Sequence, residues 1–142
     1  MYLLDTNVIS EMRKMGTRRA DPVVQRWVDR TSVFDSYISA ISILEIETGI
    51  QLLMKRDPAQ ANVLWKWLHG HVLPSYDGRI ISVDTIVALR CAKLHVPVTM
   101  SYMDALIGAT ALVQGMTVVT RNVKDFEPMG VKVLNPWTDL AD

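Results

Sequence analysis

The stretch Tyr2-Leu3-Leu4-Asp5 decides the fold class of this chain. It is an apolar run without polar alternation, it ends in an acid, and a helix-like segment at residues 6–12 follows at once. Such a run is typical of a strand that is buried on both faces, as in a parallel sheet covered by helices. We therefore expect Asp5 at the carboxyl end of a first buried strand, with Thr6 capping the helix.

The rest of the chain alternates between strand-like and helix-like segments. Helix starts are marked by Asp21-Pro22 and Asp57-Pro58, because Asp suits the N-cap and Pro suits the first helical position. Strands are expected at residues 33–39, 79–83, 116–120 and 131–134, and further helices at residues 42–53, 85–95 and 102–114. The alternation predicts an α/β fold in three layers, with a central, mostly parallel sheet of four to five strands flanked by helices. Residues 1–142 are expected to form a single domain.

Composition narrows the functional classes. The formal net charge is zero, so the overall charge does not indicate a nucleic-acid partner, although a local basic patch can still attract a polyanion. The single cysteine, Cys91, excludes an internal disulfide and is expected to be buried. No apolar run approaches the roughly 18 residues of a membrane span, and no signal peptide is visible. We expect a cytoplasmic protein without membrane association.

In a parallel sheet, ligands bind beyond the carboxyl ends of the strands. Acidic residues that are expected at this edge are therefore the candidates for a functional site. Asp5 follows the first strand, Glu45 lies near the start of the helix at 42–53, and Asp104 lies near the start of the helix at 102–114. Each has a structural alternative: Asp5 as a helix cap, Glu45 as the partner of Ser42 in a capping box, and Asp104 as an acid favoured by the helix dipole.

A fourth group of oxygen ligands follows the strand at 116–120. Thr120, Asn122 and Asp125 are close together in Thr-Arg-Asn-Val-Lys-Asp, where turn chemistry is the alternative interpretation. Four separate segments thus present oxygen atoms at one predicted edge of the sheet. Hard cations such as Mg²⁺ and Mn²⁺ prefer these ligands, and clustered carboxylates need a cation to neutralise them. Acid-bound metals that activate water are typical of phosphodiester cleavage.

These segments resemble the PIN-domain ribonucleases, in particular the VapC/FitB-type toxins of bacterial toxin–antitoxin pairs. The matching motifs are Leu-Leu-Asp5-Thr-Asn-Val-Ile-Ser, Ile-Ser-Ile-Leu-Glu45-Ile-Glu-Thr-Gly, Met-Asp104-Ala-Leu-Ile-Gly-Ala-Thr-Ala, Val-Thr-Arg-Asn122-Val-Lys-Asp125-Phe and the closing Asn-Pro-Trp137. The first four of these motifs, in this order and with a resemblance that covers the whole chain, make a strong signal.

The resemblance implies a PIN fold and endonucleolytic cleavage of RNA that depends on Mg²⁺ or Mn²⁺, with Asp5, Glu45 and Asp104 as catalytic and metal-binding residues. It also implies a small antitoxin that blocks the groove, a homodimer, and a larger complex on DNA. A fourth acid often stands at the position of Asn122 in this family. Here it is an amide, so one tightly held metal is expected, and Asp125 is the candidate that compensates.

Other features are secondary. Arg13 and Lys14, with Arg18 and Arg19, form the densest basic stretch, and they either hold RNA phosphates or lie in a solvated loop. The helix that begins at Pro58 is expected to face the core with Ala61, Leu64, Trp65, Leu68 and Val72.

Two other functions stay open at this point. An aspartyl phosphatase needs a second acid two residues after Asp5, where Asn7 stands. A non-catalytic Mg²⁺-binding receiver or DNA-regulatory interaction domain would need a phosphoacceptor at the end of a central strand, and only Asp84 is available.

Overall fold

The computed structural model describes residues 1–96 and 99–139. Its centre is a five-stranded sheet in the order β3-β2-β1-β4-β5, in which every pairing is parallel. The strands are β1 (Tyr2–Leu4), β2 (Ser36–Ser39), β3 (Ile80–Ile81), β4 (Thr117–Val119) and β5 (Val133–Leu134). The parallel α/β fold expected from the sequence is confirmed, and the segment at 131–134 is a paired edge strand.

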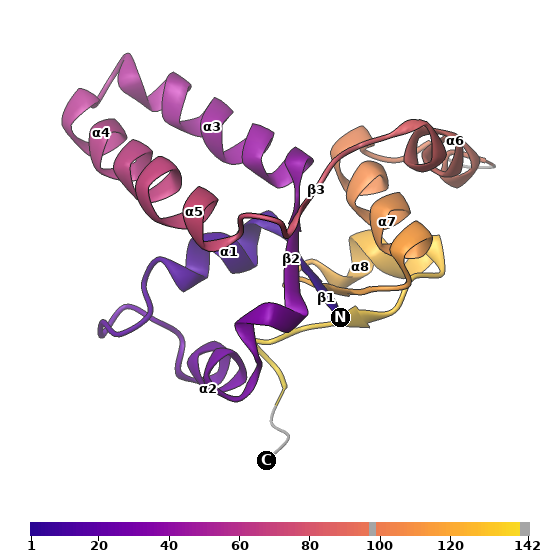
Figure 1. Ribbon diagram of the computed structural model, residues 1–142, viewed down its shortest axis with the longest axis horizontal. Coiled ribbons are helices and arrows are strands. Elements are labelled where there is room, and N and C mark those ends of the chain that lie inside the picture. The colour runs from indigo at the N-terminus through magenta and orange to yellow at the C-terminus, as the bar shows by residue number, and fades with distance from the viewer. Residues whose placement is uncertain (97–98, 140–142) are drawn as a thin grey trace.

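Helices cover both faces of this sheet, as Figure 1 shows. One side carries α1 (Thr6–Met12), α2 (Pro22–Arg30), α3 (Ala40–Met54), α4 (Pro58–Trp67) and the short α5 (Leu73–Ser75). The other side carries α6 (Thr85–Leu94), α7 (Tyr102–Gln114) and α8 (Val123–Phe126). Single 3₁₀ turns lie at Val33–Asp35 and Glu127–Met129, and a π-helical turn at Leu68–Val72 joins α4 to α5.

The first strand shows why two helical layers are needed. Leu4 packs on the side of α1 to α4, with Val8 and Ile38, whereas its neighbour Leu3 packs on the side of α7, with Ile107. Both leucines are almost completely buried. Adjacent side chains of a strand point to opposite faces, so an apolar run without alternation requires apolar cover on both faces.

Helices α3 and α4 form an arm that projects from the sheet (Figure 1). Helices α2 and α4 are capped as predicted by Asp21 and Asp57, which accept hydrogen bonds from the first turn of each helix. The prediction that Trp65 faces the core is wrong, because Trp65 is 42% exposed while Trp67 packs against the core. The other four residues expected to face the core do so, namely Ala61, Leu64, Leu68 and Val72, and Trp67 takes the place expected of Trp65.

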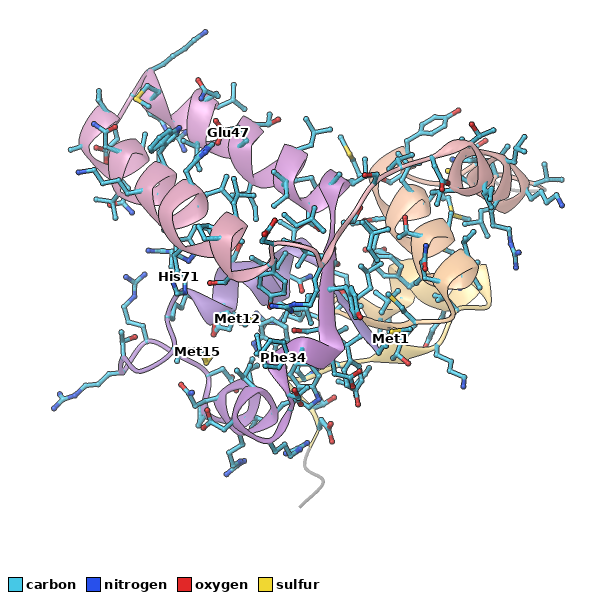
Figure 2. The ribbon with its side chains drawn as sticks, in the orientation of Figure 1. Met1, Met12, Met15, Phe34, Glu47 and His71 are labelled. Atoms are coloured by element: carbon cyan, nitrogen blue, oxygen red, sulfur yellow. The ribbon has the colours of Figure 1, made fainter. Side chains whose placement is uncertain are left out.

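Trp65 instead stacks on His69, with ring centroids 4.2 Å apart. The His69 ring nitrogen lies 3.1 Å from Glu47 on α3, so the contact links the two helices of the arm. His71 lies away from Glu47 (Figure 2), as the spacing of the two histidines predicts. Across the residues that the structure describes, no helix is long and apolar enough to cross a membrane.

The close approach of α7 to the segment after α8 depends on Gly108. A Cβ placed on Gly108 would overlap the Met129 side chain, whereas one placed on Gly49 of α3 meets no atom within 4 Å. We predict that Gly108→Val lowers the free energy of unfolding by about 1–3 kcal/mol through overpacking, while Gly49→Val changes it by less than about 0.5 kcal/mol. Urea denaturation of both variants checks this; equal effects would contradict it.

Candidate metal centre

Asp5 stands at the carboxyl end of the central strand β1 and is buried, with 5% of its surface exposed. Its Oδ1 accepts a hydrogen bond from the backbone N–H of Thr6 at 2.8 Å, and its Oδ2 accepts one from the hydroxyl of Thr120 at 2.7 Å. Asp5 rather than Thr6 therefore caps α1, which corrects the expectation. One oxygen serves the helix, and the other faces the end of β4.

Glu45 is held over Asp5 by Thr6. The capping box expected between Ser42 and Glu45 is wrong, because α3 begins earlier and Ser39 caps it by accepting from the N–H of Ile41. This start places both Ser42 and Glu45 on the side of Thr6. The Thr6 hydroxyl lies 3.1 Å from Ser42 Oγ and 3.2 Å from Glu45 Oε1. The carboxylate is thus directed to the end of β1 instead of the start of its own helix.

Asp104 lies in the first turn of α7, which starts beside the start of α3 (Figure 1). Its pKa is raised from 3.8 to about 6, mainly by burial and also by the negative charges of Asp5, Asp125 and Glu45. An acid that served only to complement the helix dipole would have a lowered pKa, so the structural alternative does not explain Asp104.

The same field acts on the other two acids. The pKa of Asp5 is raised mainly by burial and also by Asp125, against hydrogen bonds from Thr120 and Thr6. The pKa of Glu45 is raised mainly by burial and also by Asp5, against the hydrogen bond from Thr6. Each acid therefore senses another acid from a distant part of the chain. The sequence expectation that these groups gather at one edge of the sheet agrees with this electrostatic coupling.

Thr120 organises the segment after β4. It is fully buried, donates to Asp5, and accepts hydrogen bonds from the backbone N–H of Asn122 and the side-chain amide of Asn7. The side chain of Asn122 makes no capping hydrogen bond at the start of α8, and Asp125 lies in the first turn of that helix, exposed. Asp125 contributes negative charge at Asp5 and Asp104, as a compensating acid should.

Asn7 is the site residue that the sequence analysis missed. Its Nδ2 lies 3.4 Å from Asp5 Oδ2 and 3.3 Å from Thr120 Oγ1, while its Oδ1 accepts from the backbone N–H of Arg121 at 3.2 Å. Asn7 therefore ties the end of β1 to the loop after β4. The available signal was its place two residues after Asp5, in the first turn of a helix that starts at the edge of the sheet.

The donors fit a hard divalent cation in their chemistry. Carboxylate and hydroxyl oxygens predominate, and the raised pKa values report negative charge that a cation would neutralise. Within residues 1–96 and 99–139, however, no group of three or more His, Cys, Asp or Glu side chains is placed so that it could hold a metal ion. The acids share an electrostatic environment but do not form a closed ligand shell, so side-chain rotations would have to bring their oxygens to one point.

Two further predicted residues lie apart from the acids. Arg13 and Lys14 line a cleft that also includes Glu45, and Lys14 forms an ion pair with Glu11 at 3.1 Å. Arg18 and Arg19 are exposed. Asp84 caps α6 by accepting from the N–H of Val87 at 2.9 Å, which gives the proposed phosphoacceptor an ordinary structural role.

Comparison with known proteins gives a consistent picture. Residues 2–130 match the family model of the PIN domain. The chain is 37% identical to toxin FitB of Neisseria gonorrhoeae, covering 98% of this chain and 100% of that protein. It is 34% identical to the VapC ribonuclease Y4jK of Sinorhizobium fredii, covering 96% of this chain and 98% of that protein. The crystal structure of FitAcB from Neisseria gonorrhoeae superposes with a TM-score of 0.86, at 35% identity, covering 97% of this chain and 99% of that one.

The raised pKa of Asp104 predicts a stabilising substitution. Because the folded state holds this proton more tightly than the unfolded state, stability is lost as pH rises from about 4 to about 6. In EDTA at pH 7.5, Asp104→Asn should raise the free energy of unfolding by about 1–2 kcal/mol after solvent screening. Below pH 4 the two proteins should be equally stable.

Chemical denaturation at the two pH values measures this difference. Asp77→Asn, at an exposed turn before β3, is the matched control and should differ from wild type at neither pH. If Asp104→Asn is less stable than wild type at pH 7.5, the ionised Asp104 carboxylate is stabilised by its surroundings in the folded protein, and the prediction is wrong.

Proposed function

The chain belongs to the PIN-domain family, and from that premise we propose that it is a metal-dependent endoribonuclease that acts as the toxin of a toxin–antitoxin pair. Relatives similar along their whole length are named as a toxin and as a VapC ribonuclease. The observation that carries the proposal is the coupling of Asp5, Glu45 and Asp104, whose pKa values are all raised at one edge of the sheet.

In this proposal Asp5 and Asp104 hold a Mg²⁺ or Mn²⁺ ion, and Glu45 completes the shell or orients water. Thr120 and Asn7 fix Oδ2 of Asp5, while Oδ1, which accepts from the N–H of Thr6, keeps a second lone pair for a ligand. The Thr6 hydroxyl fixes Oε1 of Glu45. Such an ion supplies charge neutralisation and a water of lowered pKa for attack at a phosphodiester. Thr120, Asn122 and Asp125 are auxiliary, and Arg13 and Lys14 contact RNA phosphates.

A partner protein is part of the proposal. FitAB bound to an IR36 DNA fragment superposes with a TM-score of 0.85, at 35% identity, covering 96% of each chain. By this likeness the chain takes a small cognate antitoxin, and the pair assembles on DNA. The homodimer and the cytoplasmic location expected from the sequence stay predictions.

We also propose that residues 1–142 form one PIN domain. The family match ends at residue 130, yet β5 pairs with β4 and Trp137 packs against the same core as Leu4. The segment beyond the match therefore completes the sheet and covers the core on one side.

Removing one acid should abolish activity. We predict that Asp5→Asn or Asp104→Asn lowers the rate of Mg²⁺- or Mn²⁺-dependent RNA cleavage by at least roughly 100-fold, because a ligand and its charge are lost. Labelled RNA incubated with purified protein, with and without EDTA, measures this. Asp77→Asn should cleave like wild type, and full activity in either site variant would remove the assignment.

The amide at position 122 predicts the metal count. Titration calorimetry with Mn²⁺ should find one tightly bound ion in wild type and none in Asp5→Asn. Asn122→Asp adds a fourth carboxylate and should create a second, weaker binding event. Two tight sites in the wild-type protein would contradict this interpretation of Asn122.

A further inference from the structure

A cleft of about 600 Å³ opens directly beside the acids, between α1 and the arm of α3 and α4. Thr6, Asn7 and Glu45 belong to both the cleft and the acidic site. Anything that lies in the cleft therefore reaches Glu45, whereas Asp5 and Asp104 do not line it. The cleft is a path to the reaction centre, and its lining indicates what travels along it.

The floor of the cleft is apolar and the rim is basic. The arm contributes Ile46, Ile50, Leu53, Leu64 and Trp67, and the basic residues at the rim are Arg13, Lys14, Arg56 and Arg121. Lys14 is paired with Glu11, but Arg13, Arg56 and Arg121 form no ion pair within the described part of the chain. In a chain with zero net charge, this rim is a local excess of positive charge suited to phosphates.

Arg121 is held in a defined position at the end of the cleft nearest the acids. Its guanidinium carbon lies 5.1 Å from the centroid of the Trp137 ring, and its backbone N–H donates to Asn7. Asn7 in turn contacts Asp5 and Thr120. Trp137 is fixed at its own backbone, where its N–H donates to Asn135 Oδ1 at 2.9 Å. The backbone of Arg121 is therefore tied to the acidic site through Asn7, and its guanidinium lies over the ring of Trp137.

Resting on the proposed function, we infer that Arg121, backed by Trp137, is a base-stacking platform that holds one unpaired nucleotide beside the scissile bond. Arg13 and Arg56 bind phosphates of the strand as it leaves along the cleft. A guanidinium that rests on an indole presents a flat, charged face, and bases stack on such faces. The platform makes Arg121 a substrate-positioning residue.

The charge of the rim favours RNA over a protein chain as the occupant. Of the two acids that line the cleft, Glu11 is neutralised by Lys14 and Glu45 belongs to the acidic site. A base can reach Arg121 only when it is free of its neighbours, because a paired base is covered on both faces by the helix stack. The platform thus selects single-stranded over double-stranded RNA.

The test measures binding in an Asp5→Asn background, which prevents cleavage. Fluorescein-labelled oligouridylate and oligoadenylate 12-mers, alone or annealed to each other, are titrated with protein, and anisotropy gives Kd. Arg121→Ala should raise Kd for the single strands roughly 5- to 100-fold, the range expected for one stacked base. Arg121→Lys keeps the positive charge but lacks the planar guanidinium, so it should restore little of the affinity that Arg121→Ala loses.

The matched control is Arg90→Ala, an exposed arginine on α6 whose loss should leave Kd unchanged. Arg13→Ala and Arg56→Ala should each reduce the slope of log K against log salt by about 0.7. With the Arg121 protein itself, an oligonucleotide with an abasic residue at the stacked position should bind more weakly than the intact oligonucleotide. That comparison reads the same contact without relying on the stability of a variant.

The inference is overturned if Arg121→Lys binds as tightly as Arg121, if the duplex binds as tightly as the single strands, or if Arg121→Ala behaves like Arg90→Ala. Cleavage by the wild-type protein is measured separately. If Arg121→Ala loses RNA binding but the wild-type protein shows no metal-dependent cleavage, the proposed function is wrong. The base-stacking role of Arg121 would still be supported.

Discussion

The burial of three carboxylates at one edge of the sheet, together with the repulsion among neighbouring acids, is the constraint on which the functional edge of this protein depends. Asp5, Glu45 and Asp104 arrive from three elements, and each has its pKa raised by burial and by another acid. When these acids are ionised and no cation is bound, they lower the free energy of unfolding. Replacing one of them with a neutral residue would then raise it. The cost is consistent with a protein whose site is completed by a cation, because only opposite charge relieves several carboxylates at once.

Neutral side chains hold the acids in place without neutralising them. Thr120 and Thr6 each give one hydroxyl hydrogen bond to a carboxylate oxygen, and Asn7 bridges the end of β1 to the loop after β4. Hydroxyls and amides position a carboxylate while leaving its charge available. An arginine or lysine at the same places would satisfy the acids and remove the reason for binding a metal. The basic residues instead line the neighbouring cleft, where they face the space open to a ligand.

Much of the fold could be predicted because it depends on local signals. The apolar run at Leu3 and Leu4 requires cover on both faces, and Asp-Pro pairs mark two helix starts. The errors arose where tertiary contacts override such signals. Ser42 contacts Thr6 across the site, and Trp65 stacks on His69 while Trp67 packs against the core. Asn7 was overlooked because its partners, Thr120 and Arg121, lie more than a hundred positions away.

The most direct measurement is a crystal structure of the protein grown with Mn²⁺, with the ion located by its anomalous scattering. The account predicts a peak at the carboxyl end of β1, roughly 2 Å from oxygens of Asp5 and Asp104, with Glu45 turned toward it directly or through water. The three carboxylates would then have rotated into one shell. A Mn²⁺-containing crystal with no peak between these residues, or with the ion bound elsewhere, would contradict the central claim.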